Sequence, residues 1–191
     1  WNFSGEIWNP VWEEASEIEY PMTYNAWTRM VTNATTQMQR GALDKVVLAR
    51  MCQVRFSSPV NIVRALDYLR EHYAGCYRFL FEAQAHNAFY GATPETLVKV
   101  DGRTVTADAL AGTVKRGSTP DEDAALAGQI LDDPKERREH DFVVQGLREE
   151  LRPFVETLDA DETPGLLKLS NVQHLHTPVS GQLKADYGVL P

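Results

Sequence analysis

The chain has 191 residues, of which 43% are hydrophobic and 24% charged, enough for one domain with a substantial core or for a large piece of a bigger one. A net charge of −8 argues against nucleic acid as a partner, because neutralising phosphates requires a basic face. The sequence has no apolar run of about 18 residues, so we expect no membrane span. Cys52 and Cys76 are too few for a disulfide framework or a zinc site, which favours a reducing, cytoplasmic compartment.

The first sixty residues predict two helices around one strand. Residues 1–20 are acidic and aromatic and are expected to be irregular or strand-like. Apolar residues recur at helical spacing over residues 23–40, and Gly41 is a helix stop signal. Residues 45–56 predict a strand whose apolar centre is Val-Val-Leu, and Ser-Ser-Pro at residues 57–59 predicts the start of a second helix.

The rest of the chain predicts hairpins, then helices, then more strands. The expected strands are 76–83, 88–91, 96–100 and 103–107, followed by helices at 121–131 and 134–158 and a final pair of strands within 166–185. Asp101-Gly102 predicts a hairpin turn. This order indicates an α+β fold of mixed, largely antiparallel sheets with helices packed outside, in one domain over residues 1–191.

Two candidate acid–base residues stand in otherwise apolar or small surroundings. Lys45 shares a strand face with Val47 and Ala49. It is either an edge-strand charge that prevents aggregation or a desolvated amine whose lowered pKa would suit a general base. Glu95 ends the turn at residues 90–95 and is either a solvated carboxylate or an acid held against a cavity.

Two further segments offer oxygen and backbone groups. The small residues at 109–113 let backbone N–H groups approach an anion, although an ordinary strand exit is an equal reading. Glu136 and Glu139 lie three residues apart on one helical face, which suits Mg²⁺. Stabilisation by the helix dipole, or intrahelical pairing with Lys135, Arg137 or Arg138, explains the same pattern without a metal.

The segment Gln173-His174-Leu175-His176 is predicted to lie on a strand. We expect the two histidines to point to opposite faces, which disfavours a paired metal site. His174 is either a cleft-lining residue or an ordinary surface histidine.

Together these segments carry a resemblance. They are KVVLAR at 45–50, GATPE at 91–95, ALAGT at 109–113, KERREH at 135–140 and NVQHL at 171–175. In this order and spacing the sequence resembles the chorismate-binding family, which includes the isochorismate, salicylate, anthranilate and aminodeoxychorismate synthases. The resemblance extends over about residues 27–181.

The resemblance implies a role for each matching position. Lys45 matches the general base that activates water for attack on C2 of chorismate, and Glu95 matches the general acid that protonates the departing C4 hydroxyl. A neutral amine can take a proton on one side while a carboxylic acid gives one on the other.

The resemblance also implies a metal and a set of substrate contacts. Glu139 matches a Mg²⁺ ligand, with Glu136 in support. Backbone groups of Gly112 and Thr113 match contacts to the ring carboxylate of the substrate, and His174 matches a residue that lines the cleft.

Two features favour the isochorismate synthases within the family. Aminodeoxychorismate synthases have a lysine nucleophile where this chain has Ala111, so this substrate-binding position disfavours covalent catalysis. Residues 141–148, DFVVQGLR, resemble the isochorismate group rather than the anthranilate group. Salicylate synthase, or a catalytically incomplete fragment, remains an alternative.

The family pattern continues beyond Pro191 with a substrate-binding arginine strand and a second metal-binding glutamate. We therefore expect the chain to be the N-terminal and central part of the catalytic domain and to be inactive as it stands. The expected partner is chorismate, without nucleic acid or membrane, and exposed edges of the incomplete sheet invite self-association.

Overall fold

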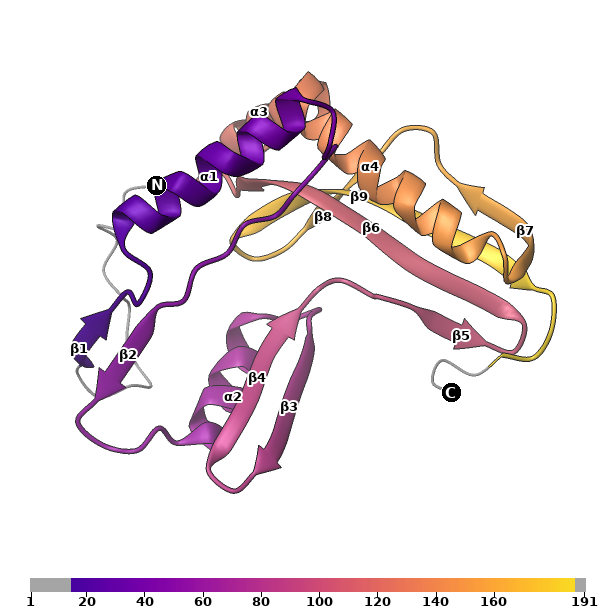
Figure 1. The fold of residues 1–191 in the computed structure, drawn as a ribbon. Coiled ribbons are helices and arrows are strands. Elements are labelled where there is room, and N and C mark those ends of the chain that lie inside the picture. Colours follow the sequence, from indigo (N-terminus) through magenta and orange to yellow (C-terminus); the bar gives the residue numbers. More distant parts are fainter. Residues whose placement is uncertain (1–14, 188–191) are drawn as a thin grey trace. The chain divides into compact units, whose positions relative to one another are not determined.

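A computed structural model describes residues 15–187 as a mixture of helices and strands (Figure 1). The chain divides into two compact units, and the boundary lies between Tyr68 and Leu69. Of the segment 1–20, which was expected to be irregular or strand-like, residues 1–14 lie outside the described residues. No helix within residues 15–187 is long and apolar enough to cross a membrane.

The first unit contains the predicted helix, α1, at Tyr24–Gln39. The Oγ1 atom of Thr23 accepts a hydrogen bond from the backbone N–H of Ala26 at 3.2 Å, which satisfies one of the free donors at the helix start. Gly41 follows the helix at a φ of 70°, a left-handed conformation that glycine adopts without steric cost. Both predicted limits of this helix are confirmed.

The strand predicted over residues 45–56 is much shorter in the structure. Strand β2 covers only Gln53–Phe56 and pairs in antiparallel fashion with β1, Ala15–Glu19. Lys45 therefore lies before the strand and not on it. A strand needs a hydrogen-bonded neighbour, and among the described residues none pairs with residues 45–52, so an apolar run alone did not suffice.

The second helix also begins later than predicted. Helix α2 covers Ile62–His72, and its start is set by Asn61, whose Oδ1 atom accepts from the N–H of Arg64 at 3.1 Å. Only Ala65 is fully buried on this helix.

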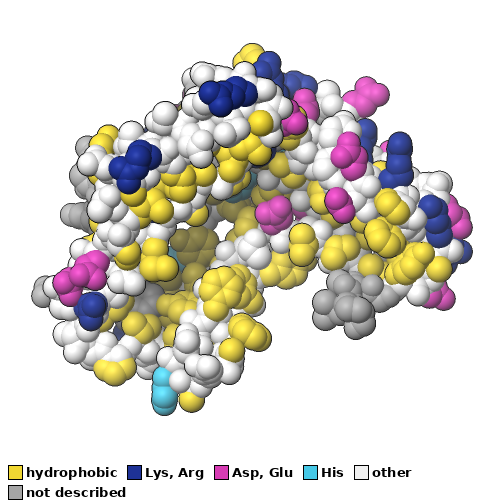
Figure 2. Space-filling model, in the orientation of Figure 1, with side chains coloured by type: hydrophobic (Ala, Val, Ile, Leu, Met, Phe, Trp, Pro, Cys, Tyr) yellow, Lys and Arg dark blue, Asp and Glu magenta, His cyan; other side chains and the backbone are white. Residues whose placement is uncertain are grey.

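In the second unit, β3 (Tyr77–Gln84) and β4 (Asn87–Thr93) form an antiparallel hairpin. The rings of Phe79 and Phe89 lie 5.2 Å apart between centroids, yet Phe89 remains 69% exposed. The exposed aromatic side chains of this hairpin form part of the apolar surface that Figure 2 shows. Both strands were predicted, and β4 runs two residues further than expected.

A five-stranded antiparallel sheet is the main element of the second unit. Its strands are β5 (Lys99–Asp101), β6 (Thr104–Lys115), β7 (Val155–Ala160), β8 (Gly165–Lys168) and β9 (Val172–Leu183). The order is β5-β6-β9-β7, and β8 also pairs with β9. The hairpin turn at Asp101-Gly102 is present, and the predicted antiparallel sheet is confirmed.

Two helices precede β7. Helix α3 covers Pro120–Asp132, and α4 covers Pro134–Leu151. The prediction that the second of these helices reaches residue 158 was wrong, because Pro153 lacks the N–H that would continue the helix and disfavours a helical residue before it. Residues 155–158 instead begin β7.

The core lies between the sheet and these helices, and in Figure 1 α4 runs along β6 and β9. Alternate residues of the two long strands are buried on this face, among them Ala107, Ala109, Leu175 and Val179. On α4, the Nε2 atom of buried His140 lies 2.8 Å from Thr177 Oγ1. The alternation therefore leaves a second face of the sheet that the core does not use.

Candidate active site

A β-bulge at Gly112 interrupts the pairing of β6 with β9. Ala111 lies opposite Leu175 and Thr113 lies opposite His174, so one residue of β6 is left over. Gly112 has a φ of 75°, which L-residues with a Cβ rarely adopt. Because the bulge shifts the alternation by one, Thr113 points to the same face as His174 instead of towards the helices.

The residues expected to bind substrate meet at this bulge. The Nδ1 atom of His174 lies 3.0 Å from Thr113 Oγ1 and 3.2 Å from the carbonyl oxygen of Gly112. A carbonyl can only accept, so a proton on Nδ1 satisfies both contacts. Ala111 lies opposite buried Leu175, on the helix-covered face.

His174 and His176 share one face of β9. The buried neighbours Gln173, Leu175 and Thr177 alternate with them. The prediction that the two histidines point to opposite faces was wrong, because residues two apart on a strand lie on the same side.

The two candidate metal ligands lie on the first turns of α4. A Cβ on Gly112 would meet Glu136 Oε2 at 3.0 Å, so this carboxylate lies directly against the bulge. The ammonium group of Lys135 lies 3.1 Å from Oε1 of Glu136 and 3.1 Å from Oε1 of Glu139. Hydrogen bonds with Glu139 and then Glu136 raise the pKa of Lys135, so the group is a firmly charged cation between two carboxylates.

These two carboxylates fit the donor chemistry of Mg²⁺, which binds oxygen and uses one or two protein carboxylates. The lysine contact shows that both can approach one cation at the same time. Within residues 15–187, however, no group of three acidic, histidine or cysteine side chains is placed to hold a metal. The pair therefore offers part of a coordination sphere.

The turn that carries Glu95 follows β4. The N–H of Glu95 donates to Thr93 Oγ1 at 3.2 Å, and its side chain is exposed. The next residue, Thr96, is tied to Asp108 on β6: its N–H donates to Asp108 Oδ2 at 3.2 Å, and its carbonyl accepts from the Asp108 N–H at 3.0 Å.

Asp108 in turn contacts His176, with Nε2 at 2.8 Å from Oδ1. Burial raises the pKa of Asp108, but the hydrogen bonds from His176 and Thr96 outweigh it and leave the pKa below the ordinary value. The sequence analysis missed this aspartate, although it comes directly before the ALAGT segment.

Lys45 belongs to the first unit, and its side chain is half-buried. The other predicted site residues all belong to the second unit. Within that unit the structure brings Gly112, Thr113 and His174 together, with Glu136 at the same bulge.

A charged cluster holds the loop that leaves the bulge. Arg116 Nε donates to Asp123 Oδ1 at 2.6 Å, and Lys168 Nζ donates to Asp123 Oδ2 at 2.8 Å. The Arg116 guanidinium, followed by Lys168 and the Gly117 N–H, holds the pKa of Asp123 well below its usual range. The sequence analysis did not identify this cluster, which joins α3, the loop after β6 and the end of β8.

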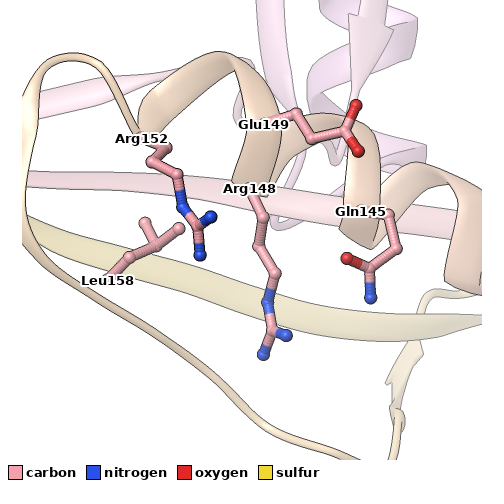
Figure 3. A pocket seen from close by; sticks show the side chains of 5 residues that line it. All are labelled: Gln145, Arg148, Glu149, Arg152 and Leu158. Atoms are coloured by element: carbon pink, nitrogen blue, oxygen red, sulfur yellow. The ribbon is translucent and has the colours of Figure 1, made fainter.

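A separate open hollow lies at the other end of α4 (Figure 3). It is lined by Gln145, Arg148, Glu149, Arg152 and Leu158, and in Figure 3 the side chains of both arginines extend from α4 in a similar direction. Arg148 Nη2 donates to the carbonyl of Ala160 at 3.0 Å. None of the predicted site residues lines this hollow. An α-helix rises about 1.5 Å per residue, so Arg148 lies more than two helical turns from Glu139 along α4.

The model of a family described as "Chorismate binding enzyme" matches residues 9–191. The chain belongs to this chorismate-binding enzyme family. The match confirms the resemblance seen in the five ordered segments.

The relatives of this chain include isochorismate synthases and, at lower identity, anthranilate synthases. The salicylate biosynthesis isochorismate synthase of Pseudomonas aeruginosa is 39% identical over 165 residues, which cover 86% of this chain and 34% of that protein. The isochorismate synthase MenF of Bacillus subtilis is 37% identical over 163 residues, covering 85% of this chain and 34% of that protein. The chain thus spans about a third of the length of these curated relatives.

A solved structure has the same fold. The structure of MenF, the menaquinone-specific isochorismate synthase from Escherichia coli, superposes with a TM-score of 0.83 at 31% identity. The superposition covers 91% of this chain and 40% of that one. The predicted α+β fold of the chorismate-binding enzymes is therefore confirmed.

Proposed function

We propose that this chain is part of an isochorismate synthase, which converts chorismate to isochorismate by adding water at C2 and losing the C4 hydroxyl. The observation that carries the proposal is the bulge at Gly112, where Thr113 contacts His174 and the Glu136 carboxylate lies against Gly112, all within the family's own motifs. The similarity to three isochorismate synthases supports it.

The chemistry needs a base and an acid. Lys45 would accept a proton from water as its oxygen bonds to C2, and Glu95 would donate a proton to the C4 oxygen as the C4–O bond breaks. One water is added and one is released, so the product is an isomer of the substrate. A strand-bound lysine among apolar neighbours was one argument for this base, and the structure removes it, because Lys45 precedes β2. The role of Lys45 now depends on the family resemblance.

Glu139 and Glu136 would hold Mg²⁺, which when bound supplies positive charge to stabilise the ring carboxylate of the substrate. Around that carboxylate, the bulge offers its own polar groups. Gly112 and Thr113 would contact it through their backbone, and His174 would line the cleft, with its Nδ1 atom held by the Gly112 carbonyl. Ala111 offers no nucleophile, which agrees with direct attack by water.

Several expectations stay predictions. They are a cytoplasmic location, the absence of nucleic-acid and membrane partners, self-association through strand edges, and inactivity of the 191-residue chain alone. Cys52 and Cys76 are both free thiols, which fits a reducing compartment. Use of the product for menaquinone or for salicylate is a further proposal, suggested by the names of the relatives, and use for a siderophore stays a prediction.

The test is turnover of chorismate by the full-length protein with Mg²⁺, followed by chromatography and mass spectrometry. We expect a new species with the mass of chorismate and the absorbance of isochorismate. A product lighter by pyruvate would instead identify a salicylate synthase. Absence of any turnover with chorismate would refute the proposal that the complete protein is an isochorismate synthase.

A further inference from the structure

Asp108 connects three separate segments of the second unit through its side chain. One carboxylate oxygen accepts from His176 on β9 at 2.8 Å, and the other accepts from the backbone N–H of Thr96 at 3.2 Å. Its own N–H donates to the Thr96 carbonyl at 3.0 Å, so Thr96 is held at both of its backbone polar groups. The side chains of Asp108 and His176 are each only 24% exposed, which shields the contact from water.

In the contact between Asp108 and His176, one group can only accept a hydrogen bond and the other must donate it. An ionised carboxylate can only accept, so the His176 Nε2 atom carries the hydrogen of this bond. The lowered pKa of Asp108 keeps it ionised at neutral pH, which strengthens both hydrogen bonds that it accepts. His176 lies on β9 opposite Leu110 of β6, so the pairing of these two strands fixes the position of the imidazole.

The side chain of Glu95 lacks such support. It is exposed, and within residues 15–187 it makes no hydrogen bond or ion pair. Its N–H bonds only to Thr93, two residues back. The position of the carboxylate therefore depends on the backbone of its turn, and the first fixed point after Glu95 is Thr96.

We propose that Asp108, oriented by His176, is a positioning residue that holds the Glu95 turn against β6 and so places the Glu95 carboxyl for proton transfer. This inference rests on the proposed function, because it takes Glu95 as the general acid. Asp108 does not itself touch the reacting atoms. Proton transfer requires an approach within hydrogen-bond reach, so a turn that drifts by about 1 Å slows the reaction on the order of 100-fold.

The first test measures the turn without using activity. In the full-length protein, Asp108→Ala removes the acceptor of the Thr96 N–H, so hydrogen exchange at this amide should become faster on the order of 10-fold. Asp108→Asn keeps an oxygen acceptor and should restore most of the protection. Glu156→Ala, which breaks the exposed pair with Arg103 at 3.0 Å on the same sheet, is the control and should leave Thr96 unchanged. Unchanged exchange in Asp108→Ala would overturn the inference.

The second test is a double-mutant cycle on turnover of chorismate. Asp108→Ala should lower kcat about 10- to 100-fold with little change in KM. In a Glu95→Gln background the same substitution should add almost nothing, because there is no longer an acid to position. Equal losses in both backgrounds would show a general structural role and overturn the proposal.

The two failures are distinguishable. Absence of chorismate turnover by the unmodified full-length protein contradicts the proposed function, while Thr96 exchange still decides whether Asp108 holds the turn. Full activity of Glu95→Gln contradicts the role of Glu95 as acid, and with it the catalytic part of this inference.

Discussion

Replacing Gly112 with alanine tests the bulge on which the candidate site depends. The residue has a φ of 75°, and an L-residue in this left-handed region costs about 1–2 kcal/mol. The new Cβ would also lie 3.0 Å from Glu136 Oε2, 3.4 Å from Ile130 Cδ1 and 3.5 Å from Leu175 Cδ1. The glutamate can move by a few tenths of an ångström, whereas Leu175 is fully buried.

We therefore expect Gly112→Ala to lower the free energy of unfolding by about 1–3 kcal/mol, from backbone strain and close contacts together. It should also lower turnover of chorismate at least about 10-fold, because Glu136 and the Thr113–His174 contact both depend on the bulge. Denaturant unfolding and steady-state kinetics of the full-length protein measure the two effects.

Gly102→Ala is a matched control. Gly102 has a φ of 57° in the turn between β5 and β6, and a Cβ there would meet nothing within 4 Å. It should show the backbone penalty of about 1–2 kcal/mol without loss of activity. If the two variants had the same stability and the same turnover, the bulge would have no special role and the reasoning would fail.

Three further predictions concern the base, the mechanism and the charged cluster. In the full-length protein, Lys45→Ala should lower kcat by about 10²- to 10⁴-fold while the circular-dichroism spectrum stays that of a folded protein. The control Lys99→Ala, at an exposed lysine of β5, should leave kcat unchanged. Near-normal turnover in Lys45→Ala would contradict the role of Lys45 as general base. With Ala111 in place of a nucleophile, intact-protein mass spectrometry during turnover should show no substrate adduct, and an adduct on β6 would disprove the non-covalent mechanism. The folded-state pKa of Asp123 is lowered, so its ion pair stabilises the protein above the unfolded pKa of about 3.9, and this stabilisation is lost as the pH falls below that value. The melting temperature of Asp123→Asn should therefore depend less on pH below about 4 than that of the unmodified protein. Parallel plots of melting temperature against pH for the two proteins would contradict this prediction.

Local signals in the sequence predicted most of the elements well. The helix at Tyr24–Gln39 was predicted from the spacing of its apolar residues and from Gly41, and the Asp101-Gly102 turn from residues that favour a tight hairpin. Neighbouring residues set these features, so they can be read without knowledge of the fold. The five ordered segments likewise identified the family, because motif order is a property of the chain itself.

Elements that need a distant partner could not be assigned in this way. Residues 45–52 have the composition of a strand, but a strand is decided by whether another strand pairs with it. The bulge at Gly112 depends on the register between β6 and β9, which are separated by two helices and two strands in the chain. Only that register places Thr113 beside His174.

The chemical types of the site residues were thus evident in the sequence, while their surroundings came from tertiary structure. Glu95 and Glu136 were identified from their motifs, but the contact of Glu136 with the bulge and the anchoring of the Glu95 turn by Asp108 join residues 12 to 24 positions apart. Such contacts form when the sheet and helices pack together, and no local pattern encodes them. The physical reason is that side-chain chemistry belongs to each residue, whereas burial, register and hydrogen-bond partners belong to the folded chain.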